Sequence, residues 1–152
     1  MHFKNRLKMA VKEKEVVNTR WLENMSFETE INGHKIIIDA EPDVGGDDLG
    51  PRPKPFMLAA LGGCTGMDVV SILKKMRVDI KNLNVKVDGG LTTEHPRHFY
   101  KMHVTYEIEG KDLPLDKIKK AVSLSEERYC GVSAVYNEAL ELTSEIVLIP
   151  TE

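Results

Sequence analysis

The chain has 152 residues, of which 41% are hydrophobic and 30% charged, and its net charge is −3 at pH 7. This length suits one domain of common size, which can bury a core without disulfide bonds. The mild acidity gives no electrostatic reason to expect nucleic acid or an anionic membrane surface as a partner, so we expect neither.

The N-terminal segment MHFKNRLKMAVKEKEVV carries charges every few residues and has the pattern of neither a secretory signal nor a membrane anchor. We expect residues 1–20 to be an N-terminal extension or a first strand, ahead of a single domain over residues 21–152. The longest weakly polar run, residues 55–67, is shorter than the ~20 apolar residues that span a bilayer. The sequence therefore predicts a cytoplasmic protein, and in that compartment two cysteines rarely form a permanent disulfide.

Two alternating runs surround an Asn-Gly pair near the start of the domain. Apolar residues alternate with polar ones over residues 25–31, Asn32-Gly33 follows, and Ile36 and Ile38 continue the alternation. Because both central positions of a tight hairpin turn need a positive φ, this pattern predicts a β-hairpin.

A loop and a long helix come next. Residues 41–55, EPDVGGDDLGPRPKP, hold four of the seven prolines, which predicts a stiff loop. Residues 55–77 then carry apolar side chains around most of a helical turn, and such a helix is expected to be buried on most sides. Gly62, Gly63 and Gly66 surround Cys64 in this helix. Glycine weakens a helix interior, so we expect close approach of another backbone there, either a partner's helix or the Cys130 segment.

The second half of the chain predicts a second hairpin, helices and a last strand. Alternating runs at residues 83–87 and 100–108 indicate the hairpin, and Pro114 suits the first turn of a helix that extends toward Tyr129. Gly131 interrupts this pattern, helical spacing resumes from Val132 to Leu140, and residues 144–149 form a strand. The fold class is therefore α+β.

The two cysteines are the candidate chemical groups. A cysteine is a useful nucleophile only as its thiolate, which incomplete burial and a nearby positive charge or dipole favour. Asp68 would oppose the thiolate of Cys64 if the two side chains face the same way, whereas Arg52 and Lys54 would favour it. Cys130 precedes Gly131 at a helix break, where backbone N–H groups can favour a thiolate. The alternative for both is ordinary core packing, because free cysteine is among the most buried residue types.

No other residue pattern predicts a site. His95 and His98 would need two further ligands to hold a metal, and the carboxylate pairs Asp47-Asp48 and Glu126-Glu127 are typical of solvated surfaces. The glycines of the loop do not have phosphate-loop spacing. We therefore expect no metal and no cofactor.

The segments GPRPKPFMLAALGGCTGMDVVSILKKMR and EERYCGVSA resemble the OsmC/Ohr family of osmotically inducible and organic-hydroperoxide-resistance proteins, in its OsmC-like branch. The resemblance extends from WLENMSF at residues 21–27 through EHPRHFY at residues 94–100 to the last strand. It implies antiparallel sheets wrapped around a long central helix, in an intertwined homodimer with two sites at the subunit interface.

The resemblance also implies thiol-dependent reduction of organic hydroperoxides in oxidative stress defence. Cys64 matches the peroxidatic cysteine, which becomes a sulfenic acid, and Cys130 matches the resolving cysteine, which condenses with it to a disulfide. A dithiol reductant then restores both thiols. Phe56, Met57 and Leu61 are candidates for the apolar lining of the site, or else core residues.

One departure from the family pattern keeps an alternative open. The better-known peroxidases have a glutamate shortly before the reactive cysteine, paired with an arginine, where this chain has Lys54 and Pro55; Arg20 and Arg52 are the arginines to consider. The alternative function is a non-catalytic dimer that binds a small apolar ligand at its interface. A different thiol enzyme, such as a transferase or hydrolase, has no positive support in the sequence.

Overall fold

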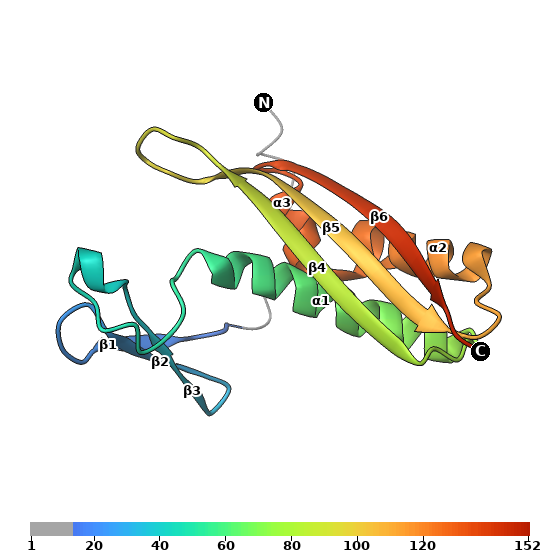
Figure 1. Ribbon diagram of the computed structural model, residues 1–152, viewed down its shortest axis with the longest axis horizontal. Helices are drawn as coiled ribbons and strands as arrows, with labels where there is room; N and C mark the ends of the chain where they lie inside the picture. The colour runs from blue at the N-terminus through green and yellow to red at the C-terminus, as the bar shows by residue number, and fades with distance from the viewer. Residues whose placement is uncertain (1–13) are drawn as a thin grey trace. The chain divides into compact units, whose positions relative to one another are not determined.

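The computed structural model in Figure 1 describes residues 14–152. Residues 1–13, and with them most of the expected N-terminal extension, lie outside the described residues. The chain forms two compact units, one ending at Pro53 and the other running from Lys54 to Glu152. Each unit has its own three-stranded sheet.

The first unit contains the predicted hairpin. Strands β1 (Asn18–Trp21), β2 (Phe27–Ile31) and β3 (His34–Ile38) are antiparallel in the order β1-β2-β3. Asn32 has φ 50° and Gly33 has φ 81°. These positive values at both central positions are what a tight turn of this kind requires, so the hairpin prediction is confirmed.

A buried carboxylate fixes the loop that follows β3. This loop begins with the 3₁₀ helix η2 (Pro42–Val44). Asp39 accepts hydrogen bonds from the backbone N–H groups of Ala40, Asp47 and Leu49. The Leu49 N–H is the main reason why the pKa of Asp39 lies below its usual value. The loop is therefore held in one arrangement, as its proline content predicts.

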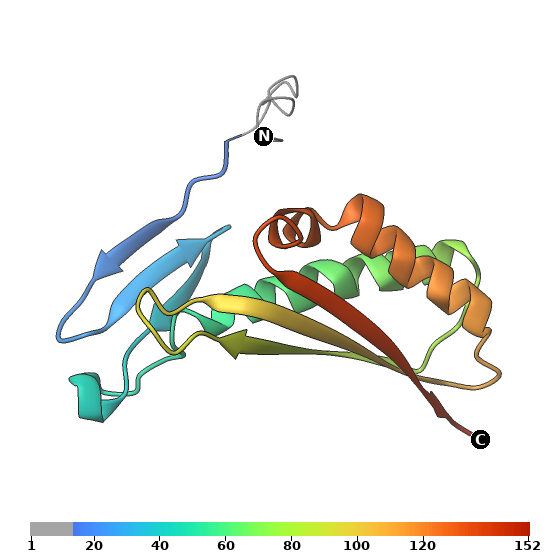
Figure 2. The ribbon, with the colours of Figure 1, turned by 90° about the horizontal axis from the view of Figure 1, so that it is seen from above.

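The second unit places three helices on one face of a sheet, as the side-on view in Figure 2 shows. The sheet has the order β4-β5-β6, with β4 (Asn82–Leu91), β5 (Phe99–Gly110) and β6 (Glu141–Pro150). The helices are α1 (Pro55–Lys75), α2 (Leu115–Leu124) and α3 (Gly131–Tyr136), and the π-helical turn η3 (Ser125–Tyr129) continues α2. This arrangement confirms the predicted second hairpin, formed by β4 and β5.

The core of the second unit lies between the helices and the inner face of the sheet. Alternate residues of β5 point into it, because side chains of a strand alternate between faces. Residues from α1 and α2 complete it. The fully buried side chains of this core are Leu61, Val69, Leu73, Met102, Val104, Tyr106, Ile108, Ile118 and Ala121. This core holds α1 and the η3 turn in place over the sheet.

Helix α1 has clear start and stop signals. Pro55 occupies the first helical turn, where its missing N–H costs nothing, and Lys74 and Lys75 lie in the last turn, where they interact favourably with the helix dipole. The helix ends within two residues of the predicted bound, and Arg77 follows with φ 55°. Its prediction as a continuous helix is confirmed.

The burial expected for α1 is not reached within the second unit. Only 22% of its most apolar window is buried. By length and composition alone, α1 is the one helix in residues 14–152 that is long and apolar enough to cross a membrane, although core helices of soluble proteins meet the same criterion.

The β5–β6 pairing corrects the expectation of purely antiparallel sheets. Lys101 of β5 pairs with Glu141 of β6, and the register continues in the parallel direction to Gly110 and Pro150. The connection between these strands consists of α2, η3 and α3, which carry the chain back to the start of the sheet. Parallel neighbours need such a crossover, so the helices between β5 and β6 account for the direction of β6.

Candidate functional site

Cys64 lies in the middle of α1, on the side that faces α3 and η3. It is half-buried and packs against the core. The dipole of a helix acts mainly within the first and last turns, so the start of α1 does not activate a thiol at this position. Any activation of Cys64 must come from another element.

Cys130 lies at the break between η3 and α3 and is 2% exposed. Its backbone is extended, with φ −73° and ψ 104°, and it caps α3: its sulfur accepts a hydrogen bond from the backbone N–H of Ser133, with an N···S distance of 3.3 Å. Its own N–H donates to the carbonyl of Ser125 at 2.8 Å. The helix break that the sequence predicts beside Gly131 thus falls on Cys130 itself.

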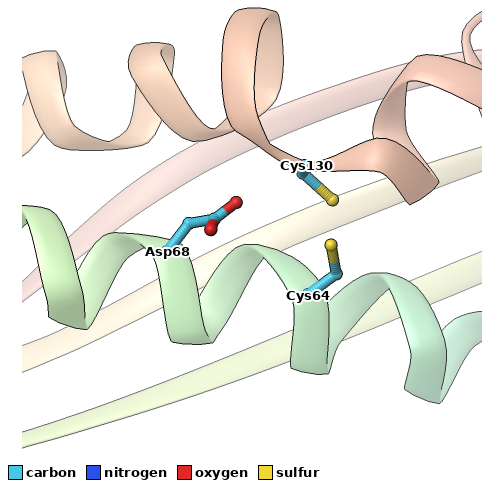
Figure 3. A group of neighbouring side chains, drawn as sticks. All are labelled: Cys64, Asp68 and Cys130. Atoms are coloured by element: carbon cyan, nitrogen blue, oxygen red, sulfur yellow. The ribbon is translucent and has the colours of Figure 1, made fainter. Parts of the chain in front are cut away.

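The two sulfur atoms point toward each other across the gap between α1 and α3, and the carboxylate of Asp68 lies beside them, as Figure 3 shows. The two Sγ atoms and a carboxylate oxygen of Asp68 all lie within 4.8 Å of one another. Both cysteines are free thiols. The structure therefore brings together the two predicted site residues and adds an acidic one.

Several groups act on the thiol of Cys64 in opposite directions. Burial is the main cause that raises the pKa of Cys64, followed by hydrogen bonding with Cys130 and the charges of Cys130 and Asp68. The backbone N–H of Val132, in the first turn of α3, lowers it. The pKa nevertheless lies above its usual value, so Cys64 is mainly a neutral thiol at pH 7.

The cations that the sequence offers as activators are engaged or distant. Lys54 is exposed and precedes Cys64 by ten residues, which is about 15 Å along a helix. In the first unit, Arg52 pairs with Asp48 at 2.6 Å, and Arg20 pairs with Glu28 at 3.2 Å. Within residues 14–152, the strongest influences on the Cys64 pKa include no cation.

The glycines around Cys64 face the sheet and the surface. A Cβ atom at Gly62 or Gly66 would lie 3.3 Å from the side chains of Val87 and Val85 of β4, whereas one at Gly63 would meet no atom within 4 Å. The close approach predicted at two of these glycines is therefore that of β4, and not that of the Cys130 segment.

A cavity of about 280 Å³ adjoins the thiol pair through Asp68. It is lined by Asp68, Ser71, Ile72, Lys75, Met76, Leu124 and Tyr129. The predicted lining lies elsewhere: Leu61 is a fully buried core residue, and Met57 is 39% exposed near the start of α1. A volume of this size accommodates a small organic group beside Asp68.

Cys64, Asp68 and Cys130 are also the one cluster of three or more potential metal ligands in the described part of the chain. A structural zinc site takes four protein ligands, so this cluster is one ligand short. His95 and His98 do not belong to it. Two thiols facing each other can instead form a disulfide when an oxidant reaches them.

Sequence reasoning missed two buried contacts around the π-helical turn. Ser125 is fully buried and donates its hydroxyl hydrogen bond to Asp68 at 3.1 Å. Tyr106 of β5 donates to Glu126 at 3.1 Å, so Glu126 is not the solvated carboxylate that its pairing with Glu127 indicates. For Ser125 the available signal was the helical spacing, which places it on the inner face of a continued α2.

The family comparison covers most of the chain. Residues 45–145 match the family model of OsmC-like proteins. The chain is 35% identical to "Protein YhfA" of Escherichia coli strain K12 over 125 residues, which are 82% of this chain and 90% of that protein.

Solved structures share the fold. A hypothetical protein from Aquifex aeolicus VF5 aligns with a TM-score of 0.80 and 24% identity over 92% of this chain and 99% of that one. An organic hydroperoxide resistance protein OsmC from Legionella pneumophila aligns with a TM-score of 0.68 and 13% identity, over 91% of this chain and 99% of that one. The family resemblance and the OsmC/Ohr fold that it implies are thus confirmed, and the chain belongs to the family of OsmC-like proteins.

Proposed function

We propose that this protein is a thiol-dependent peroxidase that reduces organic hydroperoxides, with Cys64 as the attacking thiol and Cys130 as the resolving thiol. The observation that carries the proposal is the pair of facing sulfur atoms within 4.8 Å. Family membership and the redox chemistry of such a pair support it.

The reaction begins at Cys64. Its thiolate sulfur attacks the distal oxygen of the hydroperoxide; the S–O bond forms as the O–O bond breaks, and the alkoxide takes up a proton and leaves as an alcohol. Cys64 is then a sulfenic acid. The backbone N–H of Val132, in the first turn of α3, favours the thiolate of Cys64.

Cys130 completes the oxidative half of the cycle. Its sulfur attacks the Cys64 sulfur, the S–S bond forms, and the hydroxyl group leaves with the proton of Cys130 as water. A dithiol reductant then opens the disulfide by two exchange steps and becomes a disulfide itself. The cavity beside Asp68 would take the organic group of the peroxide.

A homodimer is part of this proposal. Met67 of α1 is 76% exposed, and it lies in a groove of about 870 Å³ along α1 and β4 that includes Gly63. In the first unit, no apolar side chain among residues 14–53 is buried, whereas a small sheet needs an apolar surface to pack on. A second copy of the chain would cover the groove along α1 and β4 and would give the sheet of the first unit an apolar surface to pack on. We place this dimer in the cytoplasm.

The raised pKa of Cys64 and the presence of Lys54 and Pro55 at the expected glutamate position favour one alternative, a non-catalytic dimer that binds a small apolar ligand. Steady-state assays with cumene hydroperoxide and dihydrolipoate distinguish the two. We expect continuous peroxide loss with the native protein and none above background with Cys64→Ser. If the native protein and Cys64→Ser both consume peroxide only at the background rate, the non-catalytic binding protein is supported.

A further inference from the structure

Asp68 connects the helix of one cysteine to the turn that carries the other. It lies one helical turn after Cys64 on α1, and its Oδ2 atom accepts the hydrogen bond of the Ser125 hydroxyl at 3.1 Å. Ser125 is the first residue of the η3 turn and is fully buried. A buried hydroxyl bound to a carboxylate is a strong contact, because the acceptor is charged.

The same serine holds the backbone of Cys130. The Ser125 carbonyl accepts the N–H of Cys130 at 2.8 Å, so hydrogen bonds run from Asp68 through Ser125 to Cys130. π-helical turns are rare and occur often at functional sites. Here the turn is followed directly by Cys130, whose sulfur faces Cys64.

The carboxylate also lies within 4.8 Å of both sulfurs, where its charge repels a thiolate. The other groups near the pair include the backbone N–H groups of Val132 and Ser133 and the buried Tyr106 hydroxyl with its acceptor Glu126. Core packing alone would not favour an acidic residue at this place. The position of Asp68 is therefore explained better by an action on the thiol pair.

We infer that Asp68 is a positioning residue of the thiol pair, which holds Cys130 over Cys64 through Ser125 and faces both sulfurs with its negative charge. This role of Asp68 rests on the proposed function, because holding the two thiols together contributes to the reaction only if they form a disulfide. The two contributions are separable: Ser125→Ala removes the hydrogen bond and leaves the charge, whereas Asp68→Asn removes the charge and leaves an amide oxygen as acceptor.

The hydrogen bond is tested by equilibrating the reduced protein with oxidised and reduced glutathione and measuring the fraction of Cys64–Cys130 disulfide. We expect Ser125→Ala to lower the equilibrium constant for disulfide formation about tenfold, the value of one good hydrogen bond. Ser123→Ala is the matched control, because the Ser123 hydroxyl binds Glu127 on the exposed side of α2. Ser125→Thr, which keeps the hydroxyl, should restore the native constant and serves if the alanine variant does not fold.

The charge is tested by the rate of iodoacetamide alkylation at Cys64, followed by mass spectrometry at pH 7. We expect Asp68→Asn to react about fourfold faster or more, the factor that Coulomb's law gives in water at 4.8 Å. Asp79→Asn, at an exposed position after α1, is the control and should react like the native protein.

Equal glutathione equilibria for Ser125→Ala and Ser123→Ala, or unchanged alkylation in Asp68→Asn, would overturn the inference. Neither measurement uses a peroxide. If both expected effects appear while cumene hydroperoxide is not consumed, Asp68 has this role and the peroxidase proposal fails. If peroxide is consumed without these effects, the peroxidase proposal stands and the role of Asp68 is refuted.

Discussion

The sulfur atoms of Cys64 and Cys130 lie within 4.8 Å of each other, one in the middle of α1 and the other at the start of α3. A disulfide bond is about 2.05 Å long, so the two thiols are close but need a further approach to react.

The pH dependence of the first oxidation step follows from the raised pKa of Cys64, which burial causes first and the neighbouring Cys130 second. The thiolate is the reactive form, and below the pKa its fraction increases with pH. We expect the single-turnover rate with cumene hydroperoxide to increase about tenfold per pH unit between pH 6 and 8. Stopped-flow measurement checks this, with glutathione as the reference thiol; a plateau below pH 7 would contradict the raised pKa.

The cavity beside Asp68 should determine the preference for organic peroxides. Leu124 lines this cavity, and a tryptophan at this position would fill much of its roughly 280 Å³. We expect Leu124→Trp to lower kcat/KM for cumene hydroperoxide by about tenfold or more and to change that for hydrogen peroxide much less. An equal loss for both substrates would show that the organic group does not bind there.

The groove along α1 should be covered by a second copy. Met67 is 76% exposed in this groove, so Met67→Glu would place a charge in an apolar interface. We expect the native protein to have the mass of a dimer in light scattering and Met67→Glu to shift it toward the monomer. Thr93→Glu, in the exposed β4–β5 connection, adds the same charge and should leave the mass unchanged. A monomeric native protein would refute the dimer.

The Tyr106–Glu126 hydrogen bond should stabilise the second unit. The Tyr106 side chain is fully buried, and its hydroxyl donates to Glu126 at 3.1 Å. We expect Tyr106→Phe to lower the free energy of unfolding in urea by about 1 kcal/mol. Tyr100→Phe, at a 48% exposed position, is the control and should cost less than about 0.5 kcal/mol. Equal effects of the two variants would show that the bond contributes nothing.

Local patterns predicted the secondary structure well. The Asn32-Gly33 turn and the helix beginning at Pro55 were recovered because turn chemistry and apolar spacing act over a few residues. The parallel direction of β6 depended on distant contacts and was missed, whereas the helix break beside Gly131 was predicted and falls on Cys130. The glycine at position 131 has no positive φ and only begins α3, so the break follows from packing of the turn and not from glycine.

The two cysteines that the sequence singles out do lie close together, but the groups around them were not predicted. The order and context of the two cysteines identified them, whereas the orientation of Asp68 depends on which face of α1 lies toward η3. Ser125 carried no sequence signal beyond its helical spacing. Buried polar contacts of this kind join segments far apart in the chain, and a single sequence does not specify them.

The most direct test of the account is the fate of the two thiols after one equivalent of cumene hydroperoxide is added to the fully reduced protein. Free thiols are counted with a chromogenic disulfide reagent, and the peptides are analysed by mass spectrometry. The account predicts the loss of two thiols per chain and a disulfide that joins Cys64 to Cys130, whereas Cys130→Ser should carry a trappable sulfenic acid on Cys64. Two intact thiols in the presence of excess peroxide would contradict it.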